Sequence, residues 1–196
     1  MLPSCLVQAK PGSNDNPWMF RTLIGGMLAV TLAVACSPVF NWREVRLPQT
    51  ELKAWLPCKP DQGSRTLPLA GRDVAIHMLG CETGGALYAV SQADVGMTGA
   101  SEVQAQWQAA LLANLQAPAT QAQPWALKPM AAAAPPAAPP GLALQLQATG
   151  RRADGRAVQA QAVWFARGAW LFHAVVYADR ITPEMVEPFF SGLELP

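Results

Sequence analysis

Apolar and polar positions alternate through much of the chain between residues 45 and 95. Successive side chains of a β-strand point to opposite faces, so a run of this kind predicts a strand with one face buried. Glycine pairs and prolines mark the turns between runs. The predicted order is a strand at 45–57, a turn at 59–64, strands at 67–69 and 74–78, a turn at 84–85, and a strand at 86–95. This half of the chain therefore predicts an antiparallel meander.

A fourfold spacing of apolar residues replaces the alternation after residue 101. The positions are Val103, Trp107, Leu111 and Leu115. Residues four apart share one face of a helix, so this spacing predicts a helix over roughly 102–116. Ser101 and Gln104 have the spacing of a capping box, which predicts that Ser101 caps the first turn.

The segment 118–140 contains seven prolines separated by alanines. Such a composition predicts an extended loop without a packed core of its own. A loop of this length is unusual inside a compact domain. We expect one domain, and a division of the chain into two lobes at this loop remains open.

Alternation returns after Gly141 and continues to the end of the sheet-forming part. The predicted strands begin at Leu142, Val158 and Ala169, with tight turns at 154–155 and 167–168 between them. Thr182, Pro183 and Glu184 then form a typical helix start, and Pro188 is expected to limit or kink that helix. The sequence thus predicts three more adjacent antiparallel strands and a short final helix.

These elements together predict an α+β fold for residues 43–196. Strands, helix, loop, strands and helix follow one another, which favours an antiparallel β-sheet covered by helices, an α/β/α sandwich. A chain of 196 residues is long enough for one such domain and a targeting segment.

A strongly apolar segment without charges lies between Arg21 and Arg43. It is hydrophobic enough around residues 22–36 to enter a bilayer or a translocon. Its tightest part, residues 23–35, is thirteen residues long, whereas spanning a bilayer takes ~20 residues. We therefore predict a signal peptide or membrane anchor at 19–36.

Met19 and Arg21 supply a start and a basic region for a complete signal peptide. Residues 1–18 show no periodicity. They are predicted to be either a leader produced by a start codon assigned too far upstream or a short cytoplasmic tail.

The apolar segment leaves three forms of attachment open. Cys36 follows a run of small residues, Leu32–Ala35, that resembles a lipobox with its leucine one position early, which predicts a lipidated Cys36. Simple cleavage after Ala35 and an uncleaved anchor, extended by Val39, Phe40 and Trp42, are the alternatives. All three place the domain in the periplasm of a bacterial cell envelope, where it is attached to the membrane in two of the three.

Cys58 and Cys81 are the cysteines that remain once Cys5 in the leader and Cys36 at the membrane are set aside. In an oxidising compartment they form a natural pair. We predict a structural disulfide between them, with two unpaired buried thiols as the alternative.

Charge excludes one class of partner. Lys, Arg, Asp and Glu make up 14% of the chain, and the formal net charge is +1. Nucleic-acid binding requires a basic footprint, which is missing here, so no nucleic-acid partner is expected.

Candidate catalytic and metal-binding groups are few. His77 and His173 are the two histidines, and each falls in a predicted strand among apolar neighbours. A metal site formed by both with Glu82 is conceivable, but nothing in the spacing calls for it. A Gly-x-Ser-x-Gly elbow and a phosphate-cradling glycine motif are both missing. We predict no catalytic residue, no metal and no cofactor.

Two surface or pocket features stand out. Arg151, Arg152 and Arg156 surround the predicted turn at 154–155 and either contact lipid head groups or an acidic partner or form a solvated hairpin tip. Five aromatic residues on adjacent strands are candidates to line an apolar pocket, although such residues more often form core. They are Trp164, Phe165, Trp170, Phe172 and Tyr177.

The order of the elements resembles that of the PsbP-like α/β/α sandwich family over about residues 45–195. Three segments carry the resemblance: LKAWLPCKP entering the sheet, ALYAVSQADV before the first helix and EPFFSGLEL closing the chain. That resemblance implies an accessory, assembly or partner-binding role, in several bacterial members as an envelope lipoprotein. We therefore expect a membrane-attached envelope protein that binds a protein partner. A periplasmic carrier of a small apolar ligand and an enzyme are the alternatives.

Overall fold

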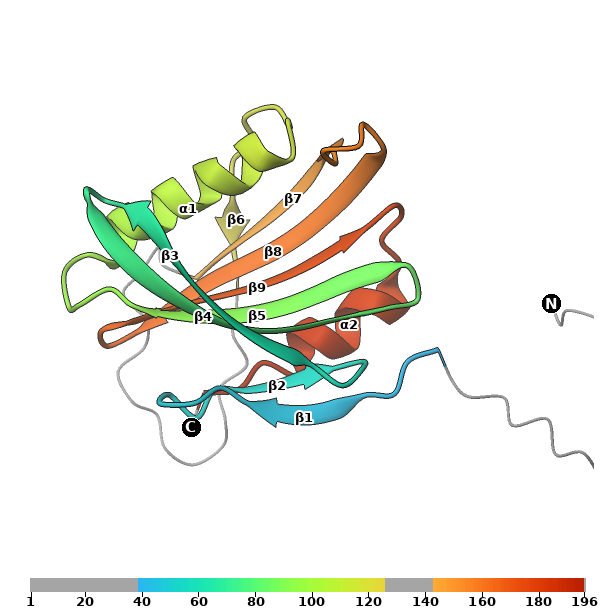
Figure 1. Ribbon diagram of the computed structural model, residues 1–196, viewed down its shortest axis with the longest axis horizontal. Helices are drawn as coiled ribbons and strands as arrows, with labels where there is room; N and C mark the ends of the chain where they lie inside the picture. The colour runs from blue at the N-terminus through green and yellow to red at the C-terminus, as the bar shows by residue number, and fades with distance from the viewer. Residues whose placement is uncertain (1–38, 126–142, 196) are drawn as a thin grey trace, which may run out of the picture. The chain divides into compact units, whose positions relative to one another are not determined.

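The computed structural model describes residues 39–125 and 143–195 (Figure 1). The predictions for residues 1–18, for the segment 19–36 and for Cys36 lie outside the described residues. Within them, no helix has the length and apolar character needed to cross a membrane.

Nine strands and two helices form the described part of the chain. The strands are β1 (Arg43–Arg46), β2 (Lys53–Leu56), β3 (Asp61–Leu69), β4 (Arg72–Thr83), β5 (Ala86–Asp94), β6 (Gln123–Pro124), β7 (Leu144–Arg151), β8 (Ala157–Arg167) and β9 (Trp170–Ala178), and the helices are α1 (Ala100–Asn114) and α2 (Pro183–Ser191). The fold is α+β and dominated by its sheet, as the sequence predicts.

Seven strands form one antiparallel sheet in the order β3-β4-β5-β9-β8-β7-β6. The two meanders predicted from the alternation, β3-β4-β5 and β7-β8-β9, are confirmed. They are joined where β5 pairs with β9, for example Val90 with Ala174. Strands from both sides of residues 126–142 therefore belong to one sheet.

One face of this sheet packs against α1. The four apolar positions predicted from the sequence face the sheet: Val103, Trp107 and Leu111 from the helix and Leu115 directly after its end. They contact two apolar groups on the sheet, one around Ile76 and Leu171 and the other around Leu146 and Val175. The predicted inward face of this helix is therefore confirmed.

The opposite face packs against α2 and against the hairpin formed by β1 and β2. Phe189 of α2 and Leu56 of β2 share a core with Phe172 and Val176 of the sheet. The hairpin forms its own two-stranded sheet, with Arg43 paired to Leu56. One helix, α2, and the hairpin thus cover this face together, as Figure 1 shows.

The structure corrects the prediction of a single entering strand at 45–57. This stretch is a hairpin, because the chain reverses between residues 47 and 52 with positive φ angles at Gln49 (74°) and Glu51 (57°). The turn predicted at 59–64 is also too long. β3 begins at Asp61, which pairs with Gly80.

Two local predictions about helices and loops need correction. α1 begins after Gly99, and no side chain caps its first turn, so the capping box of Ser101 and Gln104 is wrong. The described part of the segment predicted as a structureless loop contains β6, which pairs with β7; the rest of that loop prediction, residues 126–140, lies outside the described residues. Pro188 lies inside α2, which ends shortly after it at Ser191.

Candidate functional site

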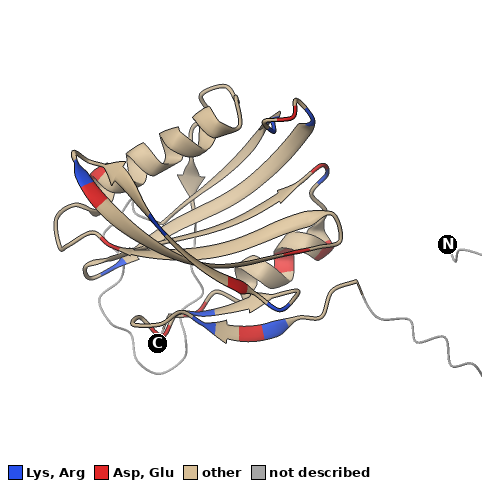
Figure 2. Cartoon of the chain, viewed as in Figure 1, with Lys and Arg blue, Asp and Glu red and all other residues tan. Residues whose placement is uncertain are grey.

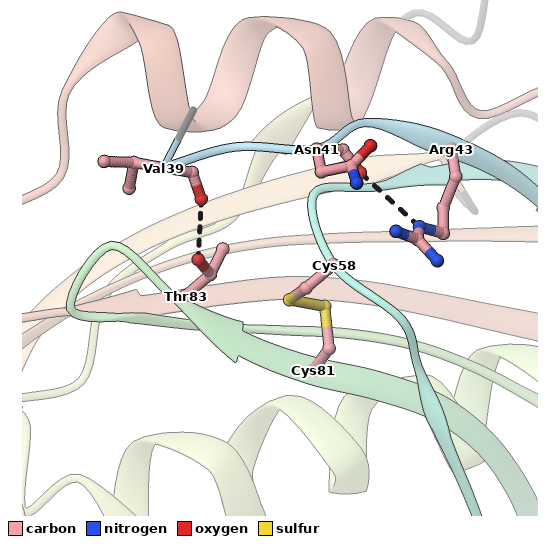
Figure 3. Close-up of a disulfide and its surroundings, with 6 residues drawn as sticks. All are labelled: Val39, Asn41, Arg43, Cys58, Cys81 and Thr83. Carbon is pink, nitrogen blue, oxygen red and sulfur yellow. Dashed lines mark hydrogen bonds between the residues drawn. A yellow bond between two sulfur atoms is a disulfide. The ribbon is translucent and has the colours of Figure 1, made fainter. Parts of the chain in front are cut away.

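Cys58 and Cys81 form a disulfide with an S–S distance of 2.07 Å and a Cα–Cα distance of 5.9 Å. The predicted pair is therefore confirmed. It links the segment after β2 to β4 and so fastens the hairpin to the large sheet (Figure 3).

The start of the described chain is held at the turn between β4 and β5. The hydroxyl of Thr83 donates a hydrogen bond to the carbonyl of Val39 at 2.7 Å (Figure 3). Phe40 lies over Gly84, where an added Cβ would be 2.8 Å from its ring. Trp42 then packs edge-on against Tyr88, with 6.1 Å between ring centroids. Residues 39–42 are thus fixed to this end of the sheet.

A pocket of about 410 Å³ opens at the same end, and we call it the end pocket. It is bounded by the β4–β5 turn, the β7–β8 turn and the chain after β9. Its lining residues are Glu82, Thr83, Gly85, Ala86, Leu87, Arg152, Arg156 and Asp179. Figure 2 shows charged residues of both signs at the β7–β8 turn and at the connection from β9 to α2.

Ion pairs organise the charges around the end pocket. Arg152 pairs with Asp179 at 3.4 Å, and Arg156 pairs with Asp154 at 2.7 Å. Hydrogen bonds from the Arg156 backbone and side chain lower the pKa of the Asp154 carboxyl. The same side-chain hydrogen bond raises the pKa of Arg156. The Nε atom of Arg152 is buried and has no partner among the described residues.

The three arginines singled out in the sequence therefore do not act as one cluster. Arg152 and Arg156 line the end pocket, whereas Arg151 donates to the carbonyl of Gly155 at 2.9 Å within the hairpin. The tight turn predicted at 154–155 is present, with Gly155 at a φ of 82°. Sequence reasoning missed Glu82 and Asp179 as neighbours of these arginines, because each comes from a different connection.

A second depression, of about 490 Å³, lies between α2 and the outer part of the sheet, and we call it the side groove. Its lining residues are Gln147, Ala148, Thr149, Gln159, Ala160, Gln161, Ile181, Thr182, Pro183, Val186 and Glu187. Uncharged amide side chains dominate its sheet side. One of them, Gln159, accepts a hydrogen bond from the backbone N–H of Ile181 at 2.7 Å.

The two histidines lie on opposite faces of the sheet. His77 is exposed on β4 and pairs in register with Gln92, on the face that carries the hairpin. His173 is buried beneath α1. Within the described residues, no group of three His, Cys, Asp or Glu side chains is placed to hold a metal ion. The structure does not bring His77, His173 and Glu82 together.

His173 lies between two tryptophan rings. Its ring centroid is 4.9 Å from that of Trp107 on α1 and 4.7 Å from that of Trp164 on β8. Burial lowers the pKa of His173 to about 3. Its Nε2, the Nε1 of Trp164 and both amide atoms of Gln104 are buried without a partner among the described residues. His173 and Trp164 lie on the sheet face under α1, and Gln104 is a buried residue of α1 itself.

The five candidate pocket aromatics are divided between the two faces. Phe165 and Phe172 belong to the core under the hairpin and α2, and Trp170 packs against that core. Trp164 and Tyr177 lie on the face under α1. Adjacent residues of a strand point in opposite directions, so these side chains do not line one pocket. That grouping is wrong, and three of the five are fully buried core.

Comparisons with known proteins complete the description. No family model and no curated protein matches the sequence. Among solved structures, the crystal structure of PA94, a protein of unknown function from Pseudomonas aeruginosa, aligns with a TM-score of 0.30 and 17% sequence identity. The alignment covers 74% of this chain and 86% of that chain.

Proposed function

We propose that this protein is a membrane-attached cell-envelope protein whose domain lies in the periplasm and acts by binding a protein partner. Attachment is by the segment 19–36, through a lipid on Cys36 or through the segment itself. As part of this proposal, the domain is a PsbP-like α/β/α sandwich in which the β1–β2 hairpin shares one face of the sheet with α2.

The disulfide is the observation that carries the location. Structural disulfides persist in oxidising compartments and are rare in the cytosol. Cys58 and Cys81 have the Cα separation of an unstrained bridge. A domain exported to the periplasm by a signal peptide or an anchor would carry both an N-terminal apolar segment and such a disulfide.

The side groove supports binding of a partner segment. Amide side chains such as Gln147 and Gln161 offer donors and acceptors without charge, and Ile181 and Val186 add apolar surface. An extended peptide presents the matching combination of backbone amides and apolar side chains. A protein segment in extended conformation is therefore the proposed occupant.

Intact mass tests the attachment and the location. The full-length gene is expressed in its native host or a close relative, and the protein is purified from the membrane fraction. We expect a chain that begins at a diacylated Cys36, or one that retains the segment 19–36, and a gain of two hydrogens on reduction. Recovery of the chain only from the cytosolic fraction, or no mass gain on reduction, contradicts the proposal.

Site-specific photo-cross-linking tests the partner. A photoreactive amino acid replaces Glu187, which is exposed and lines the side groove, and in a matched control it replaces Thr66, which is exposed on β3. Irradiation of intact cells is expected to give a discrete protein adduct at position 187 and none at 66. Identical adduct patterns at the two positions would argue against the side groove as a binding site.

A further inference from the structure

The described chain begins beside the end pocket. Val39 is bound to Thr83, and Thr83 lines the pocket. Cys36 precedes Val39 by three residues, which span at most about 11 Å. Figure 1 shows the β4–β5 turn, the β7–β8 turn and the β9–α2 connection at this same end of the sheet. A chain attached at residue 36 or just before it thus keeps the end pocket close to the membrane surface.

The end pocket offers charges of both signs from separate walls. Arg152 and Arg156 come from the β7–β8 turn, whereas Glu82 comes from β4 and Asp179 follows β9. A simple anion entering the pocket would meet two carboxylates, and a simple cation would meet two guanidinium groups. A ligand that carries a positive and a negative charge a few bonds apart can pair with the carboxylates and with the guanidinium groups at the same time.

Arg152 lines the end pocket with its side chain partly exposed and its Nη2 at 3.4 Å from Asp179. Guanidinium groups bind phosphate oxygens well through paired N–H groups. The pocket volume of about 410 Å³ falls within the range of small-ligand sites.

We infer that the end pocket binds the head group of an amine-bearing phospholipid, with Arg152 and Arg156 on the phosphate and Glu82 and Asp179 on the ammonium group. This inference rests on the membrane attachment proposed above. A phosphatidylethanolamine head group carries the required pair of charges and donates hydrogen bonds from its primary ammonium. The bound head group orients the domain with its β4–β5 turn toward the membrane.

Hydrogen–deuterium exchange of the full-length protein in lipid nanodiscs tests the inference. One set of discs contains phosphatidylethanolamine in phosphatidylcholine, a second contains phosphatidylglycerol in phosphatidylcholine, and a third contains phosphatidylcholine alone. We expect slower exchange at residues 83–87 and 151–156 in the first set only, because a quaternary ammonium donates no hydrogen bond and a glycerol head group carries no cation. Equal exchange in the three sets, or equal protection by phosphatidylglycerol, overturns the inference.

Variants assign the effect to the pocket. The double variant Arg152→Gln/Arg156→Gln is expected to lose the protection, with apparent lipid affinity lower by roughly tenfold or more. Glu82→Gln is expected to remove the preference for phosphatidylethanolamine over phosphatidylglycerol. Arg65→Gln, an exposed arginine on β3, is the matched control and is expected to retain both. Protection that survives the double variant in a folded protein overturns the assignment.

The outcomes separate this inference from the proposed function. A chain that does not remain with the nanodiscs contradicts membrane attachment itself. A chain that remains with the discs and shows unprotected turns contradicts only the head-group site.

Discussion

His173 is a buried ionisable side chain held between Trp107 and Trp164, and its Nε2 has no hydrogen-bond partner among the described residues. Desolvation disfavours the imidazolium form, which is why burial lowers the pKa so far. A neutral imidazole behaves here as an aromatic spacer that continues the stack between helix and sheet. Its unpaired nitrogen is a cost that the surrounding apolar contacts offset.

Stability is therefore expected to depend on pH through His173. The pKa is about 3 in the folded protein and near 6.5 in the unfolded chain. Between these values the unfolded chain binds a proton that the folded chain does not, so the free energy of unfolding falls as the pH decreases, by roughly 1 kcal/mol per pH unit. Urea unfolding between about pH 7 and pH 5 measures this slope.

The variant His173→Phe keeps a ring between the tryptophans and is expected to remove this contribution, which gives a shallower slope than the wild type. The control His77→Gln changes an exposed histidine and is expected to leave the slope as it is. Parallel curves for wild type and His173→Phe would disprove the role of His173.

At the scale of elements, the end of α1 is fastened to the β7–β8 hairpin through backbone atoms. The N–H of Arg151 donates to the carbonyl of Leu115 at 2.6 Å. Gly150 is required by this approach, because an added Cβ would lie 2.1 Å from the Leu115 oxygen. Gln116, at a φ of 50°, turns the chain away directly afterwards. The position of the helix over the sheet thus depends on a close backbone contact.

Gly150→Ala is expected to destabilise the protein by about 1–3 kcal/mol, since the helix end or the strand must move to admit the methyl group. Gly63→Ala is the control, because its Cβ would make ordinary contact with Met78 at 3.5 Å. That variant is expected to change the free energy of unfolding by less than about 1 kcal/mol. Thermal unfolding of the two variants measures this difference. Equal melting temperatures for Gly150→Ala and Gly63→Ala would refute the close-contact argument.

At the scale of the whole domain, the β1–β2 hairpin is a separate layer whose inward side chains, such as Leu52 and Leu56, are buried in the core shared with the large sheet. Lys53 of β2 exchanges two backbone hydrogen bonds with Glu194, at 2.9 and 3.1 Å. The disulfide adds a covalent cross-link between this layer and the seven-stranded sheet, besides the chain that runs from β2 to β3. The start and the end of the described domain are thus held together on one face of the sheet.

Removal of the bridge is expected to cost roughly 3 kcal/mol of stability in the chain-entropy model. The bridge closes a loop with a sequence separation of 23 residues. The double variant Cys58→Ala/Cys81→Ala and the reduced wild type are expected to show the same lowered urea midpoint. Oxidised and reduced proteins with equal midpoints would show that the hairpin is held by its packing alone.

The periodicity of the sequence determined most elements and the faces of most strands. Alternation and turn glycines are local signals, so both meanders and the inward face of α1 follow from them. The pairing of Cys58 with Cys81 followed from counting the cysteines beyond the apolar segment. These predictions succeed because strands, turns and helix faces depend on residues close together in the sequence, and the cysteine pairing depends on how many cysteines there are.

The tertiary structure alone decided how these pieces meet. Periodicity shows which way a side chain points but not which strand lies beside it, so the pairing of β5 with β9 was beyond its reach. For the same reason the grouping of five aromatics on two faces into one pocket was wrong. The end pocket combines Glu82 at the end of β4, Arg152 from the β7–β8 turn and Asp179 after β9, which are far apart in the chain. Such residues come together only when the strands pair, because strand order and not sequence distance determines which of them are neighbours.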